Sequence, residues 1–203
     1  MRPGDAVLAA LRGAACEMET ARLQRPAYIF ALGGVENGKL GDDARLRIAR
    51  QISQAVKGGV LPAAALGAHL RASAQAGEAF VTIDLDGGEN FNPLDAACLS
   101  RLEMEGRELA MRLAEFLRRE VEGFAGSYVA AWPARAGVRE SRRIVGRYRL
   151  EAEDLERGAQ FEDSVAYAAW PMELRETATG PAPAFSDGGR AVRDSAARAA
   201  GAR

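Results

Sequence analysis

The chain has 203 residues and a mass of 21.6 kDa, enough for one domain or at most two small ones. Hydrophobic residues make up 48% and charged residues 27%, and 27 basic against 28 acidic side chains leave a net charge of −1. This balance excludes a global basic field for nucleic acid or an anionic membrane, and no apolar run approaches the roughly 20 residues of a membrane span. Cys16, Cys98 and the lone His69 predict neither a disulfide scaffold nor a histidine metal site. We therefore expect a soluble, cytoplasmic protein without a metal, a nucleic-acid partner or a membrane.

The N-terminal apolar run, residues 6–11, is too short for a secretory signal because Arg12 interrupts it. Val7, Leu8 and Leu11 instead share one face at helical spacing, which predicts an amphipathic helix.

Two strands and two helices are predicted in the next part of the chain. Residues 26–32 are rich in β-branched and aromatic side chains and stop at two glycines, which is typical of a buried strand. Residues 42–57 have apolar positions at helical spacing and two acids at the start, which favours a helix. A weaker helix is expected over 62–76, with His69 on its surface, and a second strand over 80–85.

The longest predicted element is a helix over residues 92–121, opened by the cap and proline of Asn92-Pro93. Its large apolar side chains form one stripe and must pack on a sheet or another helix, and Cys98 beside them is expected to be a small core residue. Acid-first i,i+4 pairs such as Glu103/Arg107 are expected on its surface.

Shorter elements follow, with strand candidates at 127–131 and 137–150 and a helical turn at 151–158. Strands and helices in this irregular order predict an α+β fold, with a mixed, largely antiparallel sheet and packed helices. From Glu176 onward too few apolar groups remain to offset the cost of ordering the backbone. We therefore expect one folded region over 1–175 and a disordered tail over 176–203.

Familiar site motifs are absent or incomplete. The glycine-rich stretch 34–39 is one residue short of a phosphate loop, and 84–89 lacks the oxygen ligand and the glycine of a calcium loop. No Gly-x-Gly-x-x-Gly occurs in the sequence, so no dinucleotide-binding turn is predicted.

One stretch departs from the rest of the chain, because residues 135–149 hold six arginines and one glutamate. On one continuous strand, Glu140 and Arg142 would share a face with apolar neighbours, and Arg139 and Arg143 would lie on the other face. The pattern fits a solvated strand face whose countercharges lie elsewhere, such as at 151–154. It also fits a site for an anion.

The same stretch resembles a known family. Residues 137–150 read Gly-Val-Arg-Glu-Ser-Arg-Arg-Ile-Val-Gly-x-Tyr-x-Leu, with further matches at 23–35, 90–92 and 102–118. Together they are similar to FAD-dependent oxidoreductases, flavoproteins of the glutathione-reductase type, over roughly residues 4–174. The resemblance implies FAD as cofactor, a small-molecule substrate and part of a Rossmann-like flavoprotein fold.

The resemblance also implies that parts of the family pattern are missing. Family members open with a strand and a Gly-x-Gly-x-x-Gly turn that hold the FAD pyrophosphate. Pro3-Gly4-Asp5 looks like the stub of a later segment that lies against the flavin, so Gly4 and Asp5 are the expected cofactor contacts. We expect no family likeness in the tail from Glu176, and interpret the chain as the middle, substrate-side portion of such an enzyme.

In that interpretation Arg139, Arg142 and Arg143 lie beside the flavin ring, where they bind a carboxylate substrate and stabilise developing negative charge. Glu140 is expected to orient them. Two alternatives remain, a stand-alone module that uses the Arg139–Arg149 segment to bind an anion or a partner without catalysis, and a partly folded remnant.

Overall fold

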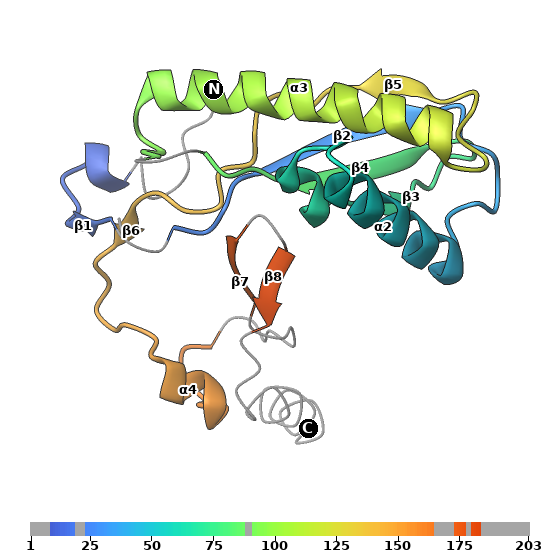
Figure 1. Ribbon diagram of the computed structural model, residues 1–203. Helices are drawn as coiled ribbons and strands as arrows, with labels where there is room; N and C mark the ends of the chain where they lie inside the picture. The colour runs from blue at the N-terminus through green and yellow to red at the C-terminus, as the bar shows by residue number, and fades with distance from the viewer. Residues whose placement is uncertain (1–8, 19–22, 88–90, 165–172, 178–179, 184–203) are drawn as a thin grey trace. The chain divides into compact units, whose positions relative to one another are not determined.

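The computed structural model describes residues 9–18, 23–87, 91–164, 173–177 and 180–183 (Figure 1). The chain divides into two compact units. The larger comprises Glu19–Ser141 and Arg175–Gly180, and the smaller Met1–Met18, Arg142–Leu174 and Pro181–Arg203. The predicted contacts Gly4 and Asp5, and residues 184–203 of the expected tail, lie outside the described residues.

The larger unit is built on a four-stranded sheet of order β3-β4-β2-β5, in which every pair of neighbours is antiparallel. Its strands are β2 (Ala27–Gly33), β3 (His69–Ala72), β4 (Ala79–Asp84) and β5 (Tyr128–Ala131). The strands predicted over 26–32, 80–85 and 127–131 are confirmed, as is the α+β class with a largely antiparallel sheet.

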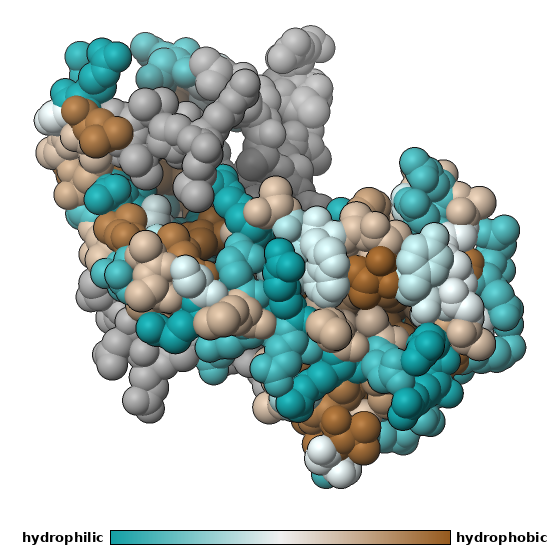
Figure 2. Space-filling model, turned by 90° about the horizontal axis from the view of Figure 1, so that it is seen from above, coloured by the Kyte–Doolittle hydropathy of each residue, from teal (hydrophilic) through white to brown (hydrophobic). Residues whose placement is uncertain are grey.

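One face of this sheet forms the core. Tyr28, Phe30 and Leu32 of β2 are at most 1% exposed, whereas Ile29, which alternates with them, is 42% exposed. The buried face joins one hydrophobic cluster with α2 (Asp42–Lys57) and α3 (Ala96–Glu120). Both helices run along the sheet in Figure 1. The surface seen from above is mainly hydrophilic, with smaller hydrophobic patches between (Figure 2).

Helix α3 begins later than its sequence indicates. Asp95, not Asn92, is the N-cap, and its carboxylate accepts the backbone N–H of Cys98 at 2.9 Å. Asn92 instead closes a short turn, because its side chain accepts the N–H of Leu94. Cys98 is buried, as predicted.

The prediction of a helix over 62–76 is wrong. A 3₁₀ turn, η1 (Ala63–Gly67), is followed by β3, which pairs with β4. Without β3, the outer edge of β4 would leave its backbone N–H and C=O groups unpaired. β3 pairs with these groups, and Leu70 is the one β3 residue that is buried, a pattern that suits an edge strand. His69 therefore lies on a strand and not on a helix, although its side chain is exposed as expected.

The smaller unit has short elements. β1 (Cys16–Glu17) pairs with β6 (Arg143–Ile144), and α4 (Ala152–Glu156) follows with a reciprocal capping box between Glu151 and Asp154. The continuous strand considered for 137–150 is not formed, since β6 covers two residues of it and Gly137 makes only an isolated bridge to Ala27.

β7 (Glu173–Thr177) and β8 (Gly180–Pro183) form a separate two-stranded sheet. β8 lies within the segment that was expected to be a tail. Among the described residues, no helix is long and apolar enough to cross a membrane.

Gly106 in the middle of α3 tests the packing of the helix on β2. A Cβ atom there would lie 2.5 Å from Cδ2 of the fully buried Tyr28 ring. We expect Gly106→Ala to lower the free energy of unfolding by about 1–3 kcal/mol, because the clash outweighs the better helix propensity of alanine. Urea denaturation measures this change. Gly41→Ser adds a side chain where no atom lies within 4 Å and should leave stability the same or slightly higher. Equal effects of the two variants would contradict the packing argument.

Candidate functional site

The arginine-rich segment returns to the main sheet at Gly137, beside the first residue of the central strand β2. Ala27 and Gly137 exchange both backbone hydrogen bonds, at 3.0 Å and 2.7 Å. The neighbouring Ala136 is buried, and its backbone N–H is donated to the carboxylate of Glu103 on α3. The segment is therefore held to the first residue of β2 and to α3.

Arg139 binds a buried carboxylate and a backbone carbonyl of the larger unit. Its Nη2 lies 2.8 Å from Oδ1 of Asp84, and its Nη1 donates to the backbone carbonyl of Arg25. Asp84, at the end of β4, is fully buried, whereas the Arg139 side chain is 28% exposed. A buried carboxylate requires such a cationic partner, because its desolvation is otherwise uncompensated.

Glu140, the residue after Arg139, accepts a backbone hydrogen bond. Its Oε2 accepts the backbone N–H of Gln24 at 3.0 Å. Close by in sequence, Arg25 forms an ion pair with Asp86. The segment 136–140 is thus tied at Ala136, Gly137, Arg139 and Glu140 to the strands and the helix around it. We call these four ties the 136–140 clamp.

A buried phenol, that of Tyr28, lies on the face of β2 that packs into the core. The Tyr28 side chain is fully buried, and burial raises the pKa of Tyr28, which the charge of Arg107 partly offsets. Arg107 itself lies over the Trp132 ring, 5.6 Å from its centroid. The expected Glu103/Arg107 pair is therefore replaced, since Glu103 binds Ala136 and Arg107 covers Trp132.

The four site residues predicted in the arginine-rich segment do not belong to one compact unit. Arg139 and Glu140 belong to the larger unit, and Arg142 and Arg143 to the smaller. Arg143 lies in β6, where its Cα is paired with that of Glu17.

The countercharges of the arginine-rich stretch are not those expected from the sequence. Asp84 pairs with Arg139, and Glu17 pairs with Arg149. Asp154, one of the expected partners, instead accepts hydrogen bonds from the Glu151 N–H and the Tyr148 hydroxyl. Sequence reasoning missed the roles of Asp84, Glu17 and Glu103 because each contacts a residue far away along the chain.

The described helices do not fit the pyrophosphate of a flavin dinucleotide. Such a group binds at a helix N-terminus with free N–H groups and no negative charge. α2 has Asp42 and Asp43 in its first turn, and the α3 N-terminus is closed by Asp95. The described part of the chain also contains no cluster of three or more metal-ligating side chains.

Comparison with known proteins identifies the family. A family model described as FAD dependent oxidoreductase matches residues 3–194, nearly the whole chain. The chain therefore belongs to the FAD-dependent oxidoreductases, and FAD is the cofactor of the family, as the resemblance implied. No curated protein and no solved structure matches it. The match runs past Glu176 to residue 194, so the expectation that family likeness ends before the tail is wrong.

The ion pair of Arg139 and Asp84 gives a first test of the 136–140 clamp. Arg139→Gln leaves the Asp84 carboxylate buried without its cation, and we expect a loss of about 2–4 kcal/mol in the free energy of unfolding. Arg149→Gln breaks a pair whose side chains are 63% and 42% exposed, and should cost less than about 1 kcal/mol. Urea denaturation of both variants measures the difference. A small loss for Arg139→Gln would show that the pair does not hold the segment.

The smaller unit offers a test by pH. The N–H of Glu151, then the hydroxyl of Tyr148 and the guanidinium of Arg157, hold the pKa of Asp154 below its usual value. A lowered pKa in the folded state means that Asp154 stabilises this region above about pH 4, and that the contribution is lost as the pH falls through the folded pKa. NMR of the Tyr148 ring should show an acid transition that Asp154→Asn abolishes and Asp163→Asn, at an exposed acid, retains. A transition that survives in Asp154→Asn would exclude this carboxylate as its cause.

Proposed function

We propose that this chain forms the substrate-side portion of a FAD-dependent oxidoreductase of the glutathione-reductase type, which takes hydride from a small organic substrate. The family match over residues 3–194 supports the flavin chemistry. The 136–140 clamp supports the placement, because it fixes the start of the family's arginine-rich motif on the sheet. Fixed geometry is what a substrate-binding segment needs, since small displacements of binding groups reduce catalysis strongly.

Within this proposal the predicted site residues take different roles. Arg139 and Glu140 are positioning residues, because the Arg139 guanidinium binds Asp84 and the Arg25 carbonyl, and Glu140 binds the Gln24 backbone. Arg142 and Arg143 follow directly in the sequence, and we propose that they bind the carboxylate of the substrate, to which guanidinium groups are suited as bidentate donors. Gly4 and Asp5 remain the proposed contacts to the flavin.

We further propose that the pyrophosphate of the flavin is held by a segment outside these 203 residues. The acidic N-termini of α2 and α3 support this, as does the lack of a Gly-x-Gly-x-x-Gly in the sequence. The alternative of a stand-alone anion-binding module on residues 139–149 is less well supported, because Arg139 and Arg149 at its two ends already pair with carboxylates.

Flavin binding by the isolated 203-residue chain tests where the pyrophosphate is held. The purified protein should be colourless, and added FAD should keep its free fluorescence, because the described helices offer the pyrophosphate no free N-terminus. Stoichiometric FAD retained through gel filtration would overturn the proposal that a further segment supplies this contact. Heat-denatured protein with the same amount of FAD provides the baseline for adventitious binding.

The DNA on both sides of the reading frame provides an independent test. A strand, a Gly-x-Gly-x-x-Gly turn and a helix encoded just upstream, in any frame, would support the interpretation of the chain as a middle portion. If no such segment is encoded there, and none is supplied by a co-purifying chain, the substrate-side interpretation fails.

A further inference from the structure

The junction between α2 and α3 contains a cationic recess away from the 136–140 clamp. The recess has a volume of about 310 Å³, and its lining includes Lys39 from the loop after β2, Arg47 and Arg50 from α2, and Glu122 from the chain after α3. All of these residues belong to the larger unit. Three cations and one carboxylate leave a local charge of about +2 in a chain of net charge −1.

The single carboxylate neutralises only one of these cations. Glu122 Oε1 lies 2.6 Å from Lys39 Nζ, which raises the pKa of Lys39 and lowers that of Glu122. Arg47 lies near enough for its charge to act on both groups, against the protonated lysine and in favour of the carboxylate. Neither Arg47 nor Arg50 has an ion-pair partner among the described residues.

The spacing of three polar residues on α2 places their side chains on the helix face that lines the first recess. Arg47, Arg50 and Gln51 stand at positions i, i+3 and i+4, so they share one face of the helix. The buried Ile48 lies among them in the lining of the recess. The guanidinium groups of Arg47 and Arg50, one ammonium and one amide therefore line a single concave surface.

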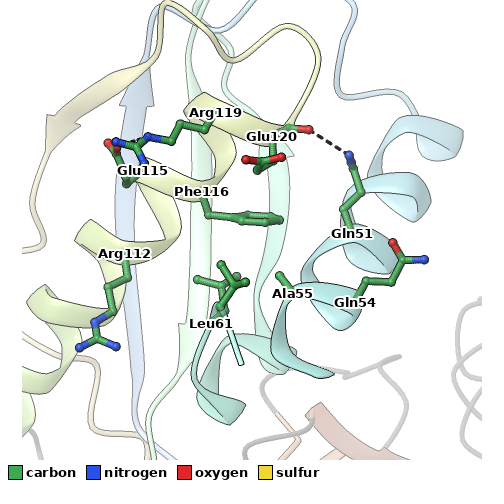
Figure 3. A pocket seen from close by; sticks show the side chains of 10 residues that line it. Gln51, Gln54, Ala55, Leu61, Arg112, Glu115, Phe116, Arg119 and Glu120 are labelled. Carbon is green, nitrogen blue, oxygen red and sulfur yellow. Dashed lines mark hydrogen bonds and ion pairs between the residues drawn. The ribbon is translucent and has the colours of Figure 1, made fainter. Parts of the chain in front are cut away.

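A second, less polar recess adjoins the first and shares Gln51 with it. It has a volume of about 580 Å³, and its apolar lining consists of Ala55, Val60, Leu61 and Phe116. Figure 3 shows the Phe116 ring between Leu61 and Glu120, with Gln51 and Gln54 across from it on α2. Gln51 Nε2 donates to the Glu120 carbonyl at 3.0 Å, which fixes the amide between the two recesses.

The arginines of the second recess differ from those of the first, because they are already paired. Arg112 binds Glu108 at 2.7 Å, and Arg119 binds Glu115 at 2.5 Å. Glu120 also lines the second recess, so two arginines and two glutamates balance there. Excess positive charge thus lies in the first recess and the larger apolar surface in the second. A ligand that fills both must carry negative charge at one end and an apolar group at the other.

We propose that the α2–α3 junction binds a small phosphate monoester with an aromatic or aliphatic body. The phosphate lies among Lys39, Arg47 and Arg50, and the body lies against Phe116, Val60 and Leu61. A phosphate monoester has a charge of about −1.5 to −2 at neutral pH, which matches the local charge better than the single charge of a carboxylate. The site uses no residue of the 136–140 clamp and no flavin chemistry, so it stands independently of the proposed oxidoreductase function.

Binding of three probes to the 203-residue chain tests the proposal. Titration calorimetry and NMR should show phenyl phosphate binding about tenfold or more tightly than inorganic phosphate, because only the ester buries a ring. Benzoate, which has the ring and one negative charge, should bind more weakly than phenyl phosphate. Equal affinities for phenyl phosphate and inorganic phosphate, or for phenyl phosphate and benzoate, would overturn the proposal.

Variants on the two recesses separate their contributions. The double variant Arg47→Gln/Arg50→Gln should weaken phenyl phosphate binding at least tenfold and reduce its dependence on salt. The control Arg45→Gln/Arg118→Gln removes two charges from the same helices at exposed arginines that line neither recess and should retain full affinity. If both double variants lose affinity equally, the binding is a non-specific effect of net charge and the proposal fails.

The apolar recess has its own pair of variants. Phe116→Leu should weaken phenyl phosphate binding and leave inorganic phosphate unchanged. Val60→Ser makes the same test at a side chain that is 66% exposed, so its effect cannot come from loss of folding. Thermal denaturation of every variant confirms the fold. Unchanged phenyl phosphate binding in both variants would exclude the apolar recess from the site.

Discussion

The larger unit depends on the position of β2 in the centre of its sheet. This strand pairs with β4 on one side and β5 on the other, and its buried face, Tyr28, Phe30 and Leu32, joins the hydrophobic cluster of both long helices. Its first residue, Ala27, also binds Gly137 and so receives the arginine-rich motif. Because one short strand meets all these elements, core packing and the placement of the motif are coupled.

Charge at the candidate site has two physical uses. Arg139 compensates a fully buried carboxylate, and that requirement removes its guanidinium from the set of groups free to bind a ligand. Arg142 and Arg143 lie outside the 136–140 clamp, and the proposed substrate contact is assigned to them.

The same distinction separates the two surfaces of α2 and α3. On α3, Arg112 is paired with Glu108, and Arg118 and Arg119 share Glu115, so each of these arginines has an acid one turn away. On α2, Asp43 stands four residues before Arg47, but the described residues form no ion pair with Arg47 or Arg50. Glu122 comes from another part of the chain and pairs with Lys39. The unmatched charge results from the tertiary arrangement, since the whole chain is almost neutral.

The sequence by itself determined the elements whose signals are local. The strands near 26–32 and 80–85, the α3 stripe and the burial of Cys98 follow from periodicity, glycine stops and residue type, and the family from an ordered set of matching residues. Only the tertiary structure decided that 63–72 forms a 3₁₀ turn and an edge strand. It also decided that Asp84 pairs with Arg139, 55 residues away in sequence, and that Glu103 accepts the N–H of Ala136 instead of pairing with Arg107. The physical reason is that an edge strand forms where a neighbouring strand offers unpaired backbone groups, and a buried charge pairs with whichever side chain the fold brings close. Neither condition is encoded in the spacing of nearby residues.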